Sequence, residues 1–308
     1  GSAPSKTTRD GKKSETAKAK PQAKAAKAKG TKDTAGESPK SAEDKAKGKQ
    51  TYAAPTPKPL PKLGEDEGRK QAVRVIPIKG TIDLGLAPFV ERSLADGRDA
   101  AVIVFDVDTF GGRVDAAVQI RDAILGATVP TVAYINRRAI SAGALISLAA
   151  DYIVFAPGAS MGAATPVQLE GGKAKAVGEK MVSYMRSEMR ATAEAKGRDG
   201  QLAEAMVDAD VEVPGVIPKG KLLTLTTKQA LEWGLANGKS ATQRDLFDSL
   251  QLGRAEVVTQ TANWAENVAR FLTDPVVSGL LMSLGMLGLL LELYTPGFGF
   301  AGGLGLMC

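Results

Sequence analysis

The sequence predicts an α/β domain built on a parallel β-sheet, with a charged tail before it and an apolar helix after it. Apolar runs of strand length alternate with segments of helical periodicity from residue 72 onward. One run, at 100–107, is apolar almost throughout, as expected for a strand covered on both faces of a parallel sheet. Strands that alternate with helices at this spacing form βαβ units with right-handed crossovers.

The first half of the domain shows the alternation most clearly. The expected strands lie at 72–82, 100–107, 131–135 and 152–155. The expected helices, which are amphipathic or rich in small residues, lie at 86–96, 114–125 and 141–150. A turn with paired glycines is expected between the second strand and the helix that follows it.

The second half of the domain is less regular. A Gly- and Lys-rich loop is expected at 168–177. Two helices are expected next, at 178–196 and 201–208, and the first of them ends at Gly197. Strands are expected at 221–226 and 256–259.

A threonine begins the last helix of this domain. Thr226 or Thr227 can cap the helix that carries Trp233, because a hydroxyl oxygen there can accept from the first free N–H groups. One domain is therefore expected over residues 69–260, followed by a linker helix at 261–274.

The first 68 residues are expected to be a disordered tail rich in Lys, Ala and Pro. Residues 1–70 carry 18 Lys and Arg against 9 Asp and Glu, although the whole chain has a net charge of +6. Such a composition buries too little apolar area to offset the entropy of ordering. The basic charge thus belongs to the tail, and nothing favours nucleic-acid binding by the folded part.

An apolar segment near the end of the chain predicts a membrane helix. Residues 275–291 form 17 positions without a charge, which is at the lower end of the membrane-spanning range. A buried core helix and a helix at a dimer interface are the alternatives. A second apolar run follows Pro296 and Gly297, so we expect one or two membrane segments over residues 275–308, cut short by the end of the chain.

Two features follow predicted parallel strands, at the sheet edge where open α/β folds bind ligands. Ser141 stands at the start of a small-residue helix, where a helix dipole favours negative charge. The paired Gly111 and Gly112 can bring backbone N–H groups close to a substrate. A helix-capping serine and a tight turn are the structural alternatives.

The chain contains no histidine, which excludes a Ser-His-Asp triad within it. A serine nucleophile would need another base. Lysine can serve when desolvation lowers its pKa, whereas arginine keeps its proton in proteins. No metal or organic cofactor is implied.

Four segments together resemble a known family. They are FDVDTFGGRVDAA, AISAGALISLAADYIVFAPGASMGAATPV, MVDADVEVPG and PVVSGLLMSLGMLGLLLELYTPGFGFAGG. They resemble the long form of the NfeD (nodulation formation efficiency D) membrane proteases, which are similar to signal peptide peptidase A within the ClpP/crotonase superfamily. The resemblance covers roughly residues 70–308. It implies a ClpP-like spiral of ββα units and an extracytoplasmic protease domain attached to membrane helices.

The resemblance also implies the chemistry. Ser141 would be the nucleophile of a Ser-Lys dyad, with backbone N–H groups of Gly111 or Gly112 and of Ala142 as oxyanion donors. Phe110 stands where the family usually has a proline, and a bulky ring there could reshape the substrate groove. Stomatin- and flotillin-like membrane proteins would be substrates or partners, and the enzyme would act as a homo-oligomer.

The base is less clearly marked. Lys180 matches the pattern of the bacterial long forms, and Lys173 and Lys175 are alternatives in the preceding loop. In archaeal short forms the lysine position falls on Arg186 or Arg190 of this chain. Any of the three lysines could equally be a solvated surface residue.

Two functions therefore stay open. One is a membrane-bound serine endopeptidase that cleaves apolar segments of membrane-associated proteins. The other is a non-catalytic scaffold that organises a flotillin- or stomatin-like oligomer. A crotonase-type acyl-CoA enzyme is a more distant third, because a membrane attachment suits it poorly.

Overall fold

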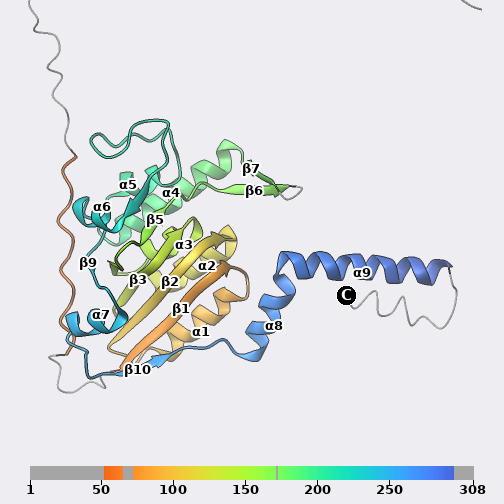
Figure 1. Cartoon of the computed structure of the whole chain (residues 1–308), viewed down its shortest axis with the longest axis horizontal. Coiled ribbons are helices and arrows are strands. Elements are labelled where there is room, and N and C mark those ends of the chain that lie inside the picture. Colours follow the sequence, from red (N-terminus) through yellow and green to blue (C-terminus); the bar gives the residue numbers. More distant parts are fainter. Residues whose placement is uncertain (1–51, 65–71, 171–172, 295–308) are drawn as a thin grey trace, which may run out of the picture. The chain divides into compact units, whose positions relative to one another are not determined.

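A computed structural model describes residues 52–64, 72–170 and 173–294, and its core is a mostly parallel sheet (Figure 1). The order of the main strands is β10-β1-β2-β3-β4-β9, all parallel to their neighbours. Their bounds are β10 Glu256–Thr259, β1 Ala72–Ile82, β2 Val102–Gly112, β3 Thr131–Ile140, β4 Tyr152–Phe155 and β9 Gly238–Lys239. The predicted α/β class with a mostly parallel sheet is confirmed.

Strand β3 changes its neighbour along its length. Its first half, Val132 to Ile135, pairs with β4, whereas Arg138 to Ile140 pairs with β5 (Ser160–Gly162). Strand β8 (Thr224–Thr226) then adds to β5 in the antiparallel sense. The sheet therefore divides at the carboxyl end of β3, immediately before Ser141.

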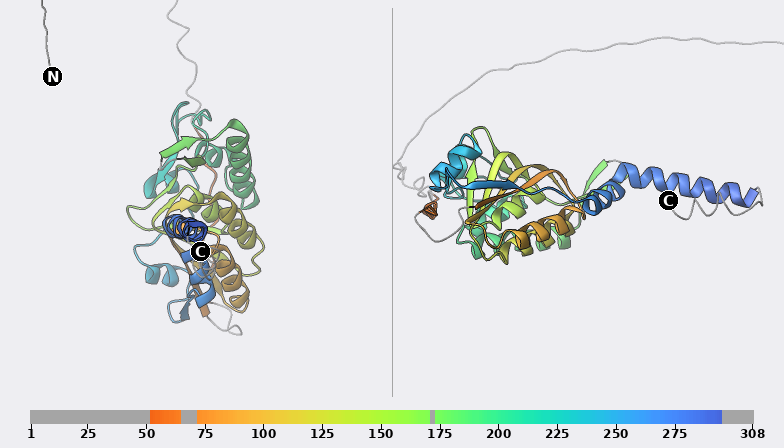
Figure 2. Two further views of the ribbon diagram at one scale, coloured as in Figure 1. Left: turned by 90° about the vertical axis from the view of Figure 1, so that its right-hand side faces the viewer. Right: turned by 90° about the horizontal axis from the view of Figure 1, so that it is seen from below.

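The helices that follow the first strands cover one face of the sheet. They are α1 (Leu86–Asp96), α2 (Val114–Leu125), α3 (Ala142–Leu148), α4 (Glu179–Ala195) and α5 (Gly200–Ala205). Each contacts the next in sequence, and Figure 2 shows α1, α2 and α4 stacked along the same side. The remaining helices are α6 (Thr227–Glu232), α7 (Gln243–Ser249), α8 (Trp264–Thr273) and α9 (Pro275–Tyr294).

The core lies between this helical layer and the sheet. The central strand β2 is buried on both faces, and Ile103, Val104 and Phe105 have no exposed surface. Each such side chain stabilises the fold by about 1.5–3 kcal/mol relative to an exposed position. This explains why residues 100–107 are apolar without alternation.

Several elements differ from the sequence prediction. Strand β2 continues through Gly112, so the expected glycine turn is the end of a strand. The expected loop at 168–177 contains a hairpin of β6 (Val167–Glu170) and β7 (Lys173–Ala176). The pattern missed β5, β9 and α7, because two or three strand residues or two helical turns show no clear period.

Residues 52–64 lie against the domain, although the tail was expected to be disordered to residue 68. Tyr52 donates to Asp199 at 2.7 Å, Asn237 donates to the Lys58 carbonyl at 2.8 Å, and the Leu63 amide donates to Leu250. Figure 1 shows this segment running beside α6, β9 and α7. Extended Pro-rich chain makes no internal hydrogen bonds, so its polar groups remain available for the domain. Residues 1–51 and 65–71 of the expected tail lie outside the described residues.

Candidate active site

Ser141 occupies a strained position between β3 and α3. Its backbone has φ 57° and ψ −122°, a region that non-glycine residues rarely adopt. Such a conformation costs about 1–3 kcal/mol and persists only where the surroundings impose it. Two hydrogen bonds hold it: the Ser141 amide donates to the Gly162 carbonyl at 2.9 Å, and the Ala144 amide donates to the Ser141 carbonyl at 2.9 Å.

The Ser141 side chain does not cap the helix that it precedes. It is the N-cap residue of α3, yet its hydroxyl accepts no hydrogen bond from the first turn. The side chain is half-buried, and within residues 52–64, 72–170 and 173–294 no group bonds to its hydroxyl. The capping alternative is therefore wrong, because the Ser141 hydroxyl does not stabilise α3.

Gly111, the first of the paired glycines, lies against Ser141, whereas Gly112 lies against β1. Gly111 has φ +108°, and a Cβ built on it would lie 2.6 Å from the Ser141 Cβ and 3.1 Å from the Ser141 Oγ. A Cβ on Gly112 would lie 2.1 Å from the Ile82 carbonyl oxygen. Both positions therefore exclude a side chain, the first because of Ser141 and the second because of strand β1.

Thr109, which the sequence analysis did not single out, fixes the glycine pair. Its hydroxyl donates to the Gly80 carbonyl at 2.5 Å and accepts from the Gly111 amide at 2.9 Å. Its methyl carbon lies 2.5 Å from the place that a Cβ on Gly143 would occupy. Thr109 thus joins the ends of β1 and β2 to the first turn of α3. The only sequence signal was its place between Asp108 and the glycines.

A buried arginine holds the other end of α3. Arg198, of which 7% is exposed, donates to the carbonyls of Leu148 and Ala150 at 3.0 and 2.9 Å and to that of Asp151 at 3.1 Å. Burial lowers the pKa of Arg198 to about 10, which still leaves the guanidinium charged at neutral pH. A cation here satisfies free carbonyls at a helix C-terminus. In the sequence, the one signal for Arg198 was its place directly after Gly197, at the end of the expected helix.

Lys180 lies in the first turn of α4, which packs against α3. Its side chain is exposed, and in the described part of the chain it makes no hydrogen bond or ion pair. The structure thus brings Ser141, Gly111, Gly112 and Ala142 together and leaves Lys180 in solvent on a neighbouring helix.

The other candidate cations are engaged or lie apart. Arg186 pairs with Asp208 and Glu179, and Arg190 pairs with Glu194 and Glu204 at 2.8 and 2.7 Å. Lys173 and Lys175 belong to β7, at the base of the loop whose tip is outside the described residues.

An open apolar groove lies between α2 and α4, beside Lys180. It encloses about 620 Å³ and is lined by Arg113, Val114, Asp115, Val118, Gln119, Met181 and Tyr184. Arg113 directly follows the glycine pair and Met181 directly follows Lys180. The lining itself includes neither of the glycines nor Lys180.

A second hollow lies on the β5 side of Ser141. It encloses about 520 Å³ and is lined by Phe110, Asn136, Arg137, Arg138, Ile140, Pro157, Gly158 and Ser160. Phe110 is 73% exposed, and the Arg138 guanidinium lies 4.4 Å from the centre of its ring. Arg138 also pairs with Asp108 at 3.3 Å. Phe110 therefore forms an exposed aromatic wall one residue from the glycine pair.

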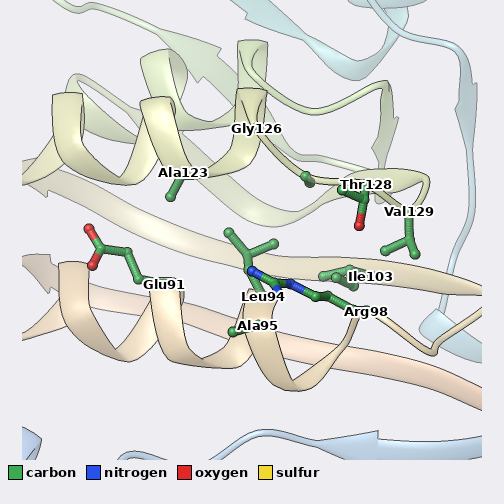
Figure 3. Close-up of a pocket in the computed structure, with 10 residues that line it drawn as sticks. Glu91, Leu94, Ala95, Arg98, Ile103, Ala123, Gly126, Thr128 and Val129 are labelled. Atoms are coloured by element: carbon green, nitrogen blue, oxygen red, sulfur yellow. The ribbon is translucent and has the colours of Figure 1, made fainter.

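A third cavity, of about 220 Å³, lies at the opposite end of the strands from Ser141. It lies between α1 and α2, where Leu94 and Arg98 face Ala123 and Val129 (Figure 3). Ile103 and Val129 stand at the amino ends of β2 and β3, whereas Ser141 follows the carboxyl end of β3. In the described part of the chain no three His, Cys, Asp or Glu residues gather as metal ligands do.

Helix α9 is long and apolar enough to cross a membrane. Its segment Val276–Tyr294 has a mean hydropathy of 2.0, and only 6% of it is buried inside the protein. A core helix would be mostly buried, so the core alternative does not hold for this segment.

Comparison with solved structures agrees with this fold. The 1510-N membrane protease of Pyrococcus horikoshii, specific for a stomatin homologue, superposes with a TM-score of 0.52 at 24% identity over 67% of this chain and 100% of that one. A lysine-to-alanine mutant of 1510-N, in complex with a substrate peptide, gives a TM-score of 0.57 at 24% identity over 67% and 99%. At this identity the likeness shows the fold alone: this chain shares the α/β fold of the 1510-N domain.

Sequence comparison identifies relatives in bacteria and archaea. The membrane protein NfeD1b of Bacillus subtilis is 40% identical over 244 residues, which are 78% of this chain and 55% of that protein. The membrane-bound protease PH1510 of Pyrococcus horikoshii is 27% identical over 252 residues, 74% of this chain and 54% of that one. The chain thus spans about half the length of these relatives. The family described as NfeD1b, N-terminal domain, matches residues 72–260, and this chain belongs to that family.

Proposed function

We propose that this chain is the proteolytic part of a membrane-bound serine endopeptidase, with Ser141 as its nucleophile. The observation that carries the proposal is the strained, uncapped Ser141 beneath Gly111. A serine held at positive φ at the start of a helix presents its hydroxyl away from the helix, toward a substrate. A purely structural serine would gain nothing from this strain.

The oxyanion donors in this proposal are the backbone N–H groups of Gly112 and Ala142. Gly111 is set aside, because its N–H group already donates to Thr109. The Arg113 amide donates to Ile82 at 2.8 Å. Since successive N–H groups of a strand point to opposite edges, that of Gly112 faces the β3 side, where Ser141 lies. Ala142 is the first residue of α3, and its N–H group has no partner within the helix.

Lys180 is the base in this proposal. Without histidine, a desolvated lysine can accept the hydroxyl proton, as in known Ser-Lys pairs. Lys180 is exposed and precedes Met181, which lines the apolar groove; in this proposal an apolar peptide bound there covers Lys180 and removes water from its ammonium group. The paired Arg186 and Arg190 cannot take this role, because an arginine keeps its proton.

The proposed reaction proceeds in three steps. The Ser141 Oγ attacks the peptide carbonyl carbon as neutral Lys180 takes the hydroxyl proton, and the oxygen becomes an oxyanion held by Gly112 and Ala142. The carbon–nitrogen bond breaks when Lys180 returns the proton to the amine. A water molecule, deprotonated by Lys180, then releases the acyl group and restores the Ser141 hydroxyl.

The substrates proposed are apolar segments of stomatin- or flotillin-like membrane proteins, cleaved on the extracytoplasmic side by a homo-oligomer. The support is the apolar groove, the span of α9, and an archaeal relative whose solved domain is named a stomatin-specific protease. Mutants of a serine and of a lysine in that relative were solved, and the two are separated by a chain length similar to that between Ser141 and Lys180.

The test is cleavage of an apolar peptide from a stomatin-like protein by the full chain in detergent. Ser141→Ala should lower the rate by about 10⁶-fold, as loss of a serine nucleophile does. Lys180→Ala should do the same, whereas Lys221→Ala, another exposed lysine, should leave the rate unchanged. If Ser141→Ala still cleaves the peptide, Ser141 is not the nucleophile. If Lys180→Ala cleaves it and Ser141→Ala does not, another residue is the base.

The second candidate is a non-catalytic scaffold for a flotillin- or stomatin-like oligomer. The exposed, unbonded ammonium of Lys180 favours it, since nothing in the described residues desolvates that group. A serine-reactive phosphonate separates the two functions. Labelling at Ser141 supports the enzyme, and its complete absence, both in detergent and in membranes, supports the scaffold.

A further inference from the structure

Helix α8 turns its polar residues toward the domain and its apolar residues outward, the reverse of an ordinary surface helix. The inward side carries Glu266, which is 7% exposed, and Arg270. The outward side carries Trp264, which is 79% exposed, and Phe271, which is 61% exposed. The helix is strongly amphipathic, yet its apolar side has no cover among the described residues.

The inward side is fastened to α1 and the loop before it. Arg92 of α1 donates to Glu266 through Nε and a terminal nitrogen, at 2.8 and 2.9 Å. Arg270 donates to Asp83 at 3.0 Å, and its Cγ lies 2.5 Å from the place of a Cβ on Gly85. A two-pronged arginine–carboxylate pair fixes orientation as well as distance. Helix α8 therefore moves with the domain.

The outward side forms one continuous stripe. Its large members are Trp264, Val268, Phe271 and Leu272, all exposed. Their spacing of four, seven and eight residues places them on a single helical face about 100° wide. Soluble monomers rarely leave so concentrated an apolar face in water.

The candidate membrane span begins almost at once after this stripe. One residue, Asp274, separates α8 from α9, and its carboxylate accepts from the amides of Val276 and Val277 at 2.9 and 3.2 Å. The end of α8 therefore lies within one helical turn of the apolar span. If α9 crosses a bilayer, the last turn of α8 is at the level of its headgroups.

We propose that α8 lies in the membrane interface, with its apolar stripe at the boundary between lipid headgroups and acyl chains. The occupant of the stripe is thus a phospholipid surface. An amphipathic helix with Trp, Phe and Leu on one face suits this depth. The inference rests on the membrane attachment proposed above. Its consequence is that lipid contact, transmitted through the Arg92–Glu266 pair, sets the orientation of the domain at the membrane.

The two tryptophans of the chain allow a direct test. Trp233→Phe leaves Trp264 as the probe, and Trp264→Phe leaves Trp233, half-buried at the end of α6, as the matched control. A third variant replaces both tryptophans by Phe and adds Leu284→Trp, near the middle of α9. Each full-length variant is reconstituted into phosphatidylcholine–phosphatidylglycerol vesicles, with bromine near either the headgroup end or the methyl end of the acyl chains.

We expect headgroup-end bromine to remove about half of the Trp264 fluorescence, because an interfacial helix lies about 5–10 Å deep. Methyl-end bromine should quench Trp264 less and Leu284→Trp more, and Trp233 should respond to neither. Quenching at position 284 without quenching of Trp264 overturns the inference while α9 stays a membrane helix. A blue-shifted, unquenched Trp264 would overturn it in favour of a contact with a second copy. If bromine does not quench the tryptophan at position 284, α9 is not in the bilayer. The proposed membrane attachment then fails, and the inference fails with it.

Discussion

Gly111 leaves open the space that Ser141 needs, since a Cβ on Gly111 would lie 2.6 Å from the Cβ of Ser141. The two residues come from different strand ends, β2 and β3, and meet where the sheet divides. Both have positive φ, which is costly at Ser141 and which Gly111 adopts without a Cβ penalty. The predictions below start from it.

Gly111→Ala should abolish peptide cleavage, because the new methyl group must displace Ser141. Gly80→Ala is the matched control: Gly80 has φ +73° but open space around it. Both variants should lose about 1–2 kcal/mol of stability through the strained backbone, and Gly111→Ala should lose more, because its methyl group also crowds Ser141. Urea unfolding and peptide cleavage are measured on both variants. If Gly111→Ala and Gly80→Ala cleave the peptide at equal rates, contact of the new methyl group with Ser141 does not affect cleavage.

The strain at Ser141 predicts a difference between two inactive variants. Ser141→Gly should be more stable than Ser141→Ala by about 1 kcal/mol, because only glycine adopts φ 57° without a Cβ penalty. Thermal unfolding of both variants measures this difference. At Ala142, which lies in helix α3, replacing Ala by Gly should instead destabilise the protein by up to about 1 kcal/mol. If glycine is destabilising at both positions, Ser141 is not strained.

Arg198→Met should destabilise the domain by about 3 kcal/mol, because three carbonyls at the end of α3 lose a buried charged donor. Arg198→Lys should recover little, since one ammonium cannot reproduce the planar fork. The free energy of unfolding is compared with that of Arg244→Met, whose exposed pair with Asp248 should contribute less than about 0.5 kcal/mol. If Arg198→Met lowers the free energy of unfolding only slightly, water molecules take over the hydrogen bonds of the guanidinium.

Phe110→Ala should change peptide KM while leaving stability within about 1 kcal/mol, because the ring is exposed. A double-mutant cycle with Arg138→Ala measures the coupling across the 4.4 Å stacking contact, expected at about 0.5–1 kcal/mol. A stability loss without any change in KM would make the ring structural rather than part of a substrate wall.

Acid should loosen α8 through Glu266. Its hydrogen bonds with Arg92 hold the pKa of this carboxyl below its usual range. The folded state therefore binds fewer protons, and the stabilisation is complete above the ordinary glutamate pKa of about 4.3 and lost as the pH falls below it. Hydrogen exchange of the α8 amides should accelerate over this range relative to β3. In Glu266→Gln, exchange should be faster at neutral pH and lack this step; an unchanged step would assign it to another group.

Much of this molecule follows from the sequence alone. The runs at 72–82 and 152–155 and the helices at 86–96 and 114–125 have the observed bounds, because burial on one or both faces imposes a period on the chain. The same local information pointed to Ser141, the glycine pair, the missing histidine and the apolar span, since each is a matter of residue type and neighbours.

Only the tertiary structure decided how these features act together. The hydroxyl of Thr109 takes the Gly111 amide, Arg198 reaches α3 from the far end of α4, and α8 points its apolar face outward. These contacts join residues distant in sequence, or depend on which face of a helix a neighbour covers. A backbone conformation such as the positive φ of Ser141 is likewise imposed from outside, by the division of the sheet at the end of β3, and no local propensity encodes it.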